Sequence, residues 1–266
     1  MALPLLLYDV LYLALAFTSY GVAGSVALRC YRFCERFLPG PPALAISVLA
    51  GLLTLIAVVG ALSALCPRLV PGRYPLGRGR VFVGWVLRSI LRRVLLVPGL
   101  KWVLYSSNVL RFLTLRALGA KVAFTASIST DVEILDPQLF EAGANCIVGA
   151  RCFISGHFVK DGELFLRKVS VGEGALLALQ SILAPGAVVG PRAVLKPGAN
   201  LAVGAQVGEA AEIGLGALVD SFARIGPRAV VATMANVPPR TKVAEGARFG
   251  GVHGEAGPDP EVEEAP

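Results

Sequence analysis

The feature that most constrains the fold is a strict six-residue period in the C-terminal half of the chain. Thirteen aliphatic residues follow one another at this spacing without a miss. They are Val171, Leu177, Leu183, Val189, Leu195, Leu201, Val207, Ile213, Val219, Ile225, Val231, Val237 and Val243. A small residue comes four positions after each of the first twelve, from Ala175 to Thr241. An α-helix repeats about every 3.6 residues and a half-buried strand about every 2, so neither produces this pattern.

A period of six gives one short strand and one turn per repeat, and three repeats close a triangular coil. We therefore predict a mainly β fold over residues 120–249, a left-handed parallel β-helix of hexapeptide repeats. The aliphatic residue of each repeat faces the interior, and the small residue faces inward near a corner. Stacked coils lie about 4.8 Å apart, so twelve repeats make four coils with a height of about 20 Å.

A fainter version of the period precedes the regular repeats and predicts two irregular coils. It runs through Val122, Ile128, Ile134 and Phe140, and after a slip of two residues through Val148 and Ile154. The segment 155–168 then interrupts the period, so we expect it to leave the prism. It carries His157, the only histidine of the repeat region. Cys146 and Cys152 stand among the repeats and are expected to be small, buried core residues.

The N-terminal part of the chain indicates a membrane protein. Over the whole chain 55% of residues are hydrophobic and only 16% are charged. Residues 5–28, apart from Asp9, and residues 43–65 are apolar, and about 20 such residues cross a bilayer. We predict a two-span anchor over residues 1–66. The first span lacks the basic start and the cleavage site of a signal peptide, so we expect it to be retained.

Basic residues follow the second span. Ten Lys or Arg and no Asp or Glu lie between Cys66 and Ala120. By the positive-inside rule this side is cytoplasmic, which predicts a β-helix on the cytoplasmic side of the inner or plasma membrane. Residues 67–119 are expected to form basic amphipathic helices on the membrane surface, broken at Pro98-Gly99. A third span over residues 81–118 is the alternative, and it would move the β-helix to the other side.

Composition excludes several other classes of protein. Residues 250–266 are acidic and rich in proline, which predicts a disordered tail. No basic stretch is interleaved with aromatic residues, so we expect no nucleic-acid partner. The five cysteines form no CxxC pair, and we expect no metal site. A β-helix of the zinc carbonic anhydrase type needs three zinc-binding histidines, and the repeat region has one.

The interrupting segment and the repeats around it resemble the galactoside and maltose O-acetyltransferases of the hexapeptide-repeat acyltransferase superfamily. The resemblance rests on Ser155-Gly156-His157, Asp161-Gly162-Glu163, Val169-Ser170-Val171-Gly172 and Ala184-Pro185-Gly186-Ala187-Val188-Val189-Gly190. It covers roughly residues 120–245. The order of spans and β-helix is also similar, more loosely, to the membrane-embedded C-terminal segments of poly-lysine-type non-ribosomal peptide synthetases.

The resemblance implies a homotrimer whose active sites lie in clefts between subunits. There an acyl group would pass from acetyl-CoA or another acyl-CoA to a hydroxyl or amine of a small-molecule or lipid-linked acceptor. His157 would be the general base, a task that an imidazole suits at neutral pH. Glu163 would orient the imidazole or contact substrate. The implied CoA contacts are Ala178 for the pantetheine and Lys196, Arg240 and Lys242 for the phosphates.

The sequence departs from that family at three points. Leu176 stands where the family has a tryptophan, and Ala184 stands where it has an asparagine before Pro-Gly. The family's terminal Gly-x-Pro-Ala motif is absent from residues 244–251. A second class of function therefore stays open, a catalytically inactive trimeric scaffold that organises partners at the membrane, because a prism is a stable rod without any chemistry.

Overall fold

The computed structural model describes residues 2–250, and it divides them into two compact units. The helical unit comprises the residues up to Arg68 together with Val83–Gly119. The β unit comprises Leu69–Phe82 and the residues from Ala120 onward. The acidic tail expected over residues 250–266 lies outside the described residues, apart from Gly250.

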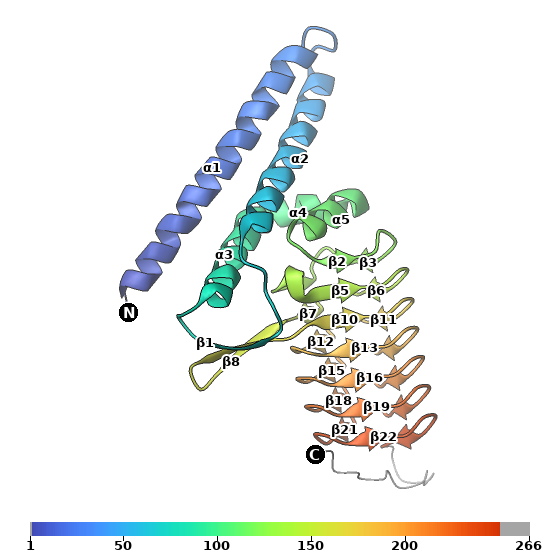
Figure 1. Cartoon of the computed structure of the whole chain (residues 1–266). Coiled ribbons are helices and arrows are strands. Elements are labelled where there is room, and N and C mark those ends of the chain that lie inside the picture. Colours follow the sequence, from blue (N-terminus) through green and yellow to red (C-terminus); the bar gives the residue numbers. More distant parts are fainter. Residues whose placement is uncertain (1, 251–266) are drawn as a thin grey trace. The chain divides into compact units, whose positions relative to one another are not determined.

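Two long helices begin the helical unit, α1 (Ala2–Cys34) and α2 (Pro41–Leu65), and they run side by side in opposite directions (Figure 1). A Cβ atom on Gly51 of α2 would lie 3.1 Å from the methyl group of Ala27, so the two helices approach closely. By length and composition alone, Leu6–Cys34 and Pro41–Leu65 are suited to cross a bilayer. The count and composition of these helices fit the expected anchor.

Three shorter helices complete this unit, α3 (Arg80–Leu95), α4 (Pro98–Ser106) and α5 (Asn108–Ala117). The break before Pro98 confirms the expected interruption there, since proline cannot continue a helix. The longest, α3, has 16 residues, fewer than the roughly 20 that span a bilayer. Arg88 of α3 donates hydrogen bonds to the Ser63 hydroxyl and to the carbonyls of Cys66 and Pro67, and so caps the end of α2.

The β unit is a prism with three walls of parallel strands, stacked coil on coil (Figure 1). The first sheet contains β2 (Lys121–Val122), β5 (Phe140–Ala142), β10 (Val169–Val171), β13 (Val188–Val189), β16 (Gln206–Val207), β19 (Arg224–Ile225) and β22 (Lys242–Val243). The second contains β3 (Ser127–Ile128), β6 (Ile147–Val148), β11 (Leu176–Leu177), β14 (Val194–Leu195), β17 (Glu212–Ile213), β20 (Val230–Val231) and β23 (Arg248–Phe249). The third contains β4 (Glu133–Ile134), β7 (Phe153–Ile154), β12 (Ile182–Leu183), β15 (Asn200–Leu201), β18 (Leu218–Val219) and β21 (Asn236–Val237). This architecture confirms the predicted fold class.

The interior of the prism follows the six-residue period. All thirteen aliphatic residues of the period are buried, and most of the small residues, such as Ala175 and Ala205, are fully buried. Gly208, at the corner between the first and second sheets, shows why some positions allow no side chain. A Cβ atom there would lie 2.5 Å from the backbone nitrogen of Pro227 in the next coil. Glycine is therefore required by the close passage of the coils.

The period is broken twice, and both breaks fall at the corner between the third and first sheets. In the regular coils Val171 pairs with Val189, eighteen residues later. Val122 pairs instead with Ala142, twenty residues later, because the 3-10 turn η1 (Pro137–Leu139) adds two residues. The two-residue slip therefore lies before Phe140, and not after it as the sequence suggested. Ala142 then pairs with Val171, since a hairpin is inserted between β7 and β10.

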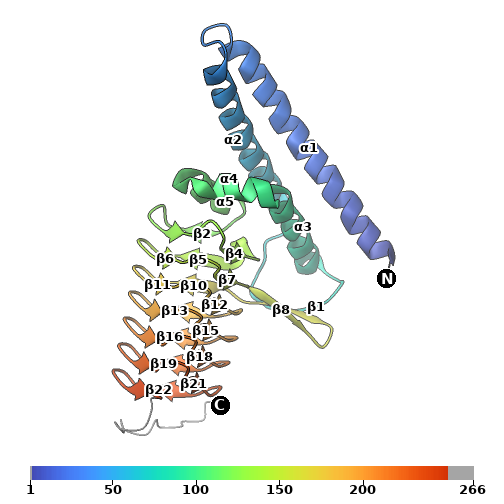
Figure 2. The same cartoon turned by 180° about the vertical axis from the view of Figure 1, so that it is seen from behind.

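The inserted hairpin consists of β8 (His157–Lys160) and β9 (Glu163–Leu166), which confirms that segment 155–168 leaves the prism. A third strand, β1 (Gly72–Pro75), lies beside this hairpin (Figure 2). It pairs with β9 and makes a three-stranded antiparallel sheet in the order β1-β9-β8. The segment 67–119, expected to be helical, thus contributes a strand to the β unit. Four residues, of which the first is a glycine and the last a proline, are too few to show a strand pattern.

The two cysteines of the repeats lie in the core, as expected. Cys146 and Cys152 are both fully buried, and burial raises the pKa of the Cys146 thiol to about 11. Burial also raises the pKa of Cys152, whose thiol donates to the carbonyl of Ala178 at 3.1 Å. Neither thiol has the lowered pKa of a reactive cysteine.

Candidate active site

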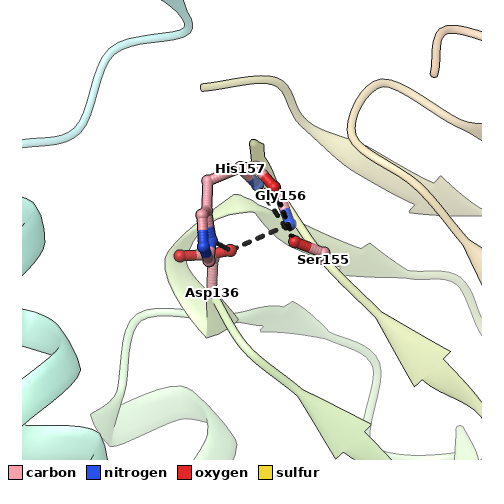
Figure 3. A network of polar contacts seen from close by, with 4 residues as sticks. All are labelled: Asp136, Ser155, Gly156 and His157. Carbon is pink, nitrogen blue, oxygen red and sulfur yellow. Dashed lines mark hydrogen bonds and ion pairs between the residues drawn. The ribbon is translucent and has the colours of Figure 1, made fainter. Parts of the chain in front are cut away.

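The two breaks in the period bring an acid and a base together. Asp136 directly precedes η1, and His157 begins β8. The imidazole Nδ1 of His157 lies 2.6 Å from Oδ2 of Asp136, which Figure 3 shows together with the neighbouring bonds. The two residues are 21 positions apart in the chain, yet they meet because both insertions leave the prism at the same corner in successive coils.

The 3-10 turn explains why Asp136 points to the hairpin. Proline at position 137 disfavours helical geometry for the residue before it, and Asp136 has φ −124° and ψ 77°. The Leu139 amide donates to the Asp136 carbonyl at 2.9 Å and closes the turn. The Asp136 residue as a whole is 3% exposed, so its carboxylate is held in a buried site.

The Ser-Gly-His motif forms the other half of the site. The Ser155 hydroxyl donates to the carbonyl of His157 at 2.8 Å and accepts the His157 amide at 3.3 Å. The Gly156 amide donates to Oδ2 of Asp136 at 2.9 Å. A Cβ atom on Gly156 would lie 2.8 Å from the Leu139 side chain. Glycine thus lets the turn and the hairpin approach, while serine fixes the backbone that carries the imidazole.

This arrangement can perform general base chemistry. A buried carboxylate that accepts from Nδ1–H selects one neutral tautomer of the imidazole, in which the lone pair lies on Nε2. The same carboxylate stabilises the imidazolium ion that forms when Nε2 takes up a proton. The His157 side chain is 22% exposed, so the imidazole reaches the surface while its partner does not.

The structure does not bring Glu163 to the imidazole. His157 is in register with Leu166, whereas Glu163 lies at the turn end of the hairpin and is in register with Lys160. The Glu163 carboxylate is paired with the guanidinium of Arg73 in β1. Asp136 has the position beside the imidazole that was expected of Glu163.

The four expected CoA contacts lie in two separate places. Ala178 and Lys196 follow β11 and β14 at the corner between the second and third sheets, and Lys196 is paired with Glu212 at 3.1 Å. Arg240 lies at the corner between the third and first sheets, where the hairpin also leaves the prism. Lys242 follows in β22. Four coils of about 4.8 Å separate Arg240 from the level of the hairpin, so they lie about 19 Å apart.

Two residues of this corner were not singled out from the sequence. Asp136 is a carboxylate next to a proline where the period slips, but the sequence alone suggests a slip after Phe140 and so gives no reason to select Asp136. The Arg167 amide donates to the Gly156 carbonyl at 2.8 Å, and its guanidinium lies 5.2 Å from the centre of the Phe222 ring. Within residues 2–250, Arg167 forms no ion pair. No local pattern marks that contact, because Phe222 belongs to a coil far along the chain.

By its repeats and its coils, the chain is a hexapeptide-repeat β-helix protein. No known family profile matches it, and neither does any curated protein sequence. Among solved structures it is similar to a hexapeptide transferase family protein from Anaplasma phagocytophilum, at 19% identity and a TM-score of 0.41, over 48% of this chain and 72% of that one.

It is also similar to PerB from Caulobacter crescentus, solved with CoA and GDP-perosamine, at 16% identity and a TM-score of 0.37, over 53% of this chain and 63% of that one. The acetyltransferase domain of PglB from Neisseria gonorrhoeae, in complex with acetyl coenzyme A, matches at 21% identity and a TM-score of 0.22, over 51% of this chain and 62% of that domain. The chain thus spans less than two thirds of these last two. We therefore infer the function of this chain from its own residues.

Proposed function

We propose that this protein is a membrane-anchored acyltransferase that moves an acyl group, with acetyl as the first to test, from acyl-CoA to a hydroxyl or amine. The observation that carries the proposal is the His157–Asp136 pair, a partly exposed imidazole held by a buried carboxylate. His157 stands in the Ser-Gly-His segment whose counterpart in the resembling family supplies the general base. His157 is the base, and Asp136 orients it.

The proposed reaction proceeds by attack on the thioester carbonyl. Nε2 of His157 takes the proton of the acceptor hydroxyl or amine as its oxygen or nitrogen forms a bond to the acyl carbon. The carbon–sulfur bond then breaks, and the imidazolium returns the proton to the leaving thiolate, which gives free CoA. Asp136 accepts the hydrogen bond from Nδ1–H and stabilises the imidazolium between the two proton transfers.

The charge pattern of the prism supports phosphate binding at the corner that carries the hairpin. At the corner between the first and second sheets, arginines are neutralised in the pairs Arg192–Glu209 and Arg228–Glu245. Arg167 and Arg240 lie at the hairpin corner, and neither forms an ion pair within the described part of the chain. Arginine without an acidic partner is suited to hold phosphate oxygens. We propose that the CoA phosphates bind along this corner, at a cleft that a neighbouring subunit of a homotrimer completes.

The helical unit supports a membrane location. Large apolar side chains stay exposed along α1 and α2, among them Phe17 at 75% and Leu65 at 83%. Contiguous apolar surface of this extent is typical of lipid contact. The ten basic residues after α2 then favour the cytoplasmic side for the β-helix, where acyl-CoA is found. The acceptor is a small molecule or a lipid-linked compound.

The test is release of free thiol from acetyl-CoA by the full-length protein in lipid vesicles, with added hydroxyl and amine acceptors. We expect His157→Ala to lower the rate by about 100-fold or more without lowering the melting temperature. CoA at millimolar concentration is expected to raise the melting temperature of both proteins. Equal rates for wild type and variant would contradict the general base. Absence of both turnover and CoA stabilisation would favour the inactive trimeric scaffold.

A further inference from the structure

The loop between α2 and α3 is held at both its base and its tip. At its base, Arg88 of α3 donates to the carbonyls of Cys66 at 3.2 Å and Pro67 at 3.3 Å. A Cβ atom on Gly84 would lie 2.8 Å from the Pro67 carbonyl oxygen, so α3 and the start of the loop are in close contact. Because the two ends of the loop are held close together, fewer conformations are open to the residues between them.

At its tip, the loop forms β1 and adds a strand to the hairpin that carries His157. Gly72 is in register with Leu166, and Pro75 is in register with Glu163. The amide of Leu76 donates to the Gly162 carbonyl at 2.9 Å and extends the pairing to the hairpin turn. A two-stranded hairpin alone is marginally stable in water, whereas a third strand and a covered edge stabilise it.

One residue of β1 contacts the hairpin with its side chain in two ways. The Arg73 guanidinium is paired with the Glu163 carboxylate and lies 5.5 Å from the centre of the Phe165 ring. Phe165 in turn stacks on Phe158, with ring centres 4.5 Å apart and an angle of 4° between the planes. Phe158 is the neighbour of His157 in the chain, so the contacts of Arg73 lead by two steps to the residue beside the imidazole.

We infer that Arg73 and Glu163 are positioning residues. They hold the hairpin in place, so that the imidazole of His157 keeps its hydrogen bond to the carboxylate of Asp136. This inference rests on the proposed function, and it gives Glu163 a role through Arg73 in place of contact with the imidazole. The base must be held in a narrow range of positions, and small displacements slow such reactions strongly. Because β1 belongs to the loop that joins α2 to α3, the order of the hairpin depends on that loop.

The experiment compares three changes of the Arg73–Glu163 pair in full-length protein in vesicles. Arg73→Glu and Glu163→Arg, each alone, are expected to lower kcat by about tenfold through misplacement of the base, with KM for acetyl-CoA within about twofold of wild type. The combined exchange restores opposite charges across β1 and β9, and we expect it to recover kcat to within about threefold of wild type. If the charge changes unfolded the protein, kcat would be low in the double variant as well. Recovery of kcat in the double variant therefore indicates that the single changes misplace the base and do not unfold the protein.

The matched control is Arg192→Glu, which breaks the pair with Glu209 on the prism. The Arg192 side chain is 66% exposed and that of Arg73 is 67%, so the two arginines face similar amounts of solvent. We expect kcat of the control to stay within about twofold of wild type, since the Arg192–Glu209 pair lies at the corner between the first and second sheets and not at the hairpin. A control that loses as much activity as Arg73→Glu would overturn the inference, and so would a combined exchange without recovery.

Hydrogen exchange gives a second readout that does not require turnover. Arg73→Glu is expected to speed amide exchange in residues 157–166 by about tenfold or more and to leave residues 188–195 of the prism unchanged. Unchanged exchange in the hairpin would overturn the inference even if the acyltransferase is active. If wild type transfers no acyl group to any acceptor, the proposed function fails, while hydrogen exchange still decides whether Arg73 holds the hairpin.

Discussion

The regular coils and the hairpin corner of the same β unit are built in opposite ways. In the regular coils, from Val171 to Val243, each strand repeats the contacts of the strand eighteen residues before it. At the hairpin corner each contact is made once, between residues of different elements. Asp136 reaches His157 over 21 positions, and Arg73 reaches Glu163 over 90.

A repetitive fold can hold chemistry where its repeat is interrupted. A coil that must match its neighbours above and below has no room for a buried acid or a reactive imidazole. Two insertions at one corner provide that room without disturbing the stack. The corner therefore holds the polar pair, while the walls hold aliphatic and small residues. Function in repeat proteins commonly lies in such departures on one face.

The largest effect should come from adding a methyl group to a tight position of the regular coils. At Gly208 the nearest atoms are backbone atoms of the next coil, the Pro227 nitrogen at 2.5 Å and the Gly226 carbonyl carbon at 2.7 Å. We expect Gly208→Ala to lower the free energy of unfolding by about 3 kcal/mol, because backbone cannot give way as a side chain does. Thermal melting followed by circular dichroism measures the effect.

The matched control lies in the hairpin turn. Gly162 has φ +73° and no atom within 4 Å of an added Cβ atom, so only backbone strain opposes an alanine there. We expect Gly162→Ala to cost about 1 kcal/mol. If both substitutions cost the same, the regular coils are not the constrained region and the contrast between the two regions is wrong.

The fold could be predicted from the sequence because its cause is local and repeated. Thirteen aliphatic residues at a spacing of six can all be buried together in stacked coils, and the structure buries all of them in this way. The strand β1 could not be predicted in this way. Its four residues gain their structure from pairing with β9, about ninety positions further along, and nothing nearby in the sequence marks that partner.

A smaller effect should distinguish the two basic corners. Removing Arg240 is expected to raise KM for acetyl-CoA by about tenfold or more, with kcat unchanged, because one hydrogen bond between charged groups contributes about 1.5 kcal/mol or more. Arg228→Ala is the control, since Arg228 is equally basic but is paired with Glu245 at the other corner. Steady-state kinetics with varied acetyl-CoA checks both. Equal changes in KM would contradict a phosphate site at the hairpin corner.

The smallest effect concerns acid stability at the base of the hairpin. Glu141 lies 3.2 Å from Lys121 and 3.1 Å from Lys168, and although burial alone would raise its pKa, the two lysines outweigh burial and lower it. A lowered pKa in the folded state stabilises the fold above the unfolded-state value, near pH 4.3, and this stabilisation is lost as the pH falls through the folded-state pKa.

Glu141→Gln should therefore lower the melting temperature slightly at pH 7, and this difference should vanish once the pH has fallen below the folded-state pKa of Glu141. Melting curves of both proteins over this pH range check the sign. A difference in melting temperature between wild type and variant that persists at low pH would show that the stabilisation by Glu141 does not come from its ion pairs with the two lysines.

Of the two residues of the candidate site, His157 could be predicted from the sequence and Asp136 could not. His157 stood out because it follows Ser155-Gly156 in the one segment that breaks the period. Asp136 did not stand out, since its role depends on which coil is shifted by two residues, and only the pairing of Val122 with Ala142 settles that. Glu163 attracted attention by its nearness in sequence, whereas the antiparallel register puts it at the far end of the hairpin from His157.

The most direct test of the account is a double-mutant cycle on the pair at the hairpin corner. The rates of acetyl transfer are measured for wild type, Asp136→Asn, His157→Ala and the double variant, each checked for an unchanged melting temperature. If Asp136 acts only through the imidazole, Asp136→Asn lowers kcat by about 100-fold or more, and the double variant is no slower than His157→Ala alone. Losses that multiply in the double variant would mean that the two residues act independently, and would contradict the pair as the catalytic unit.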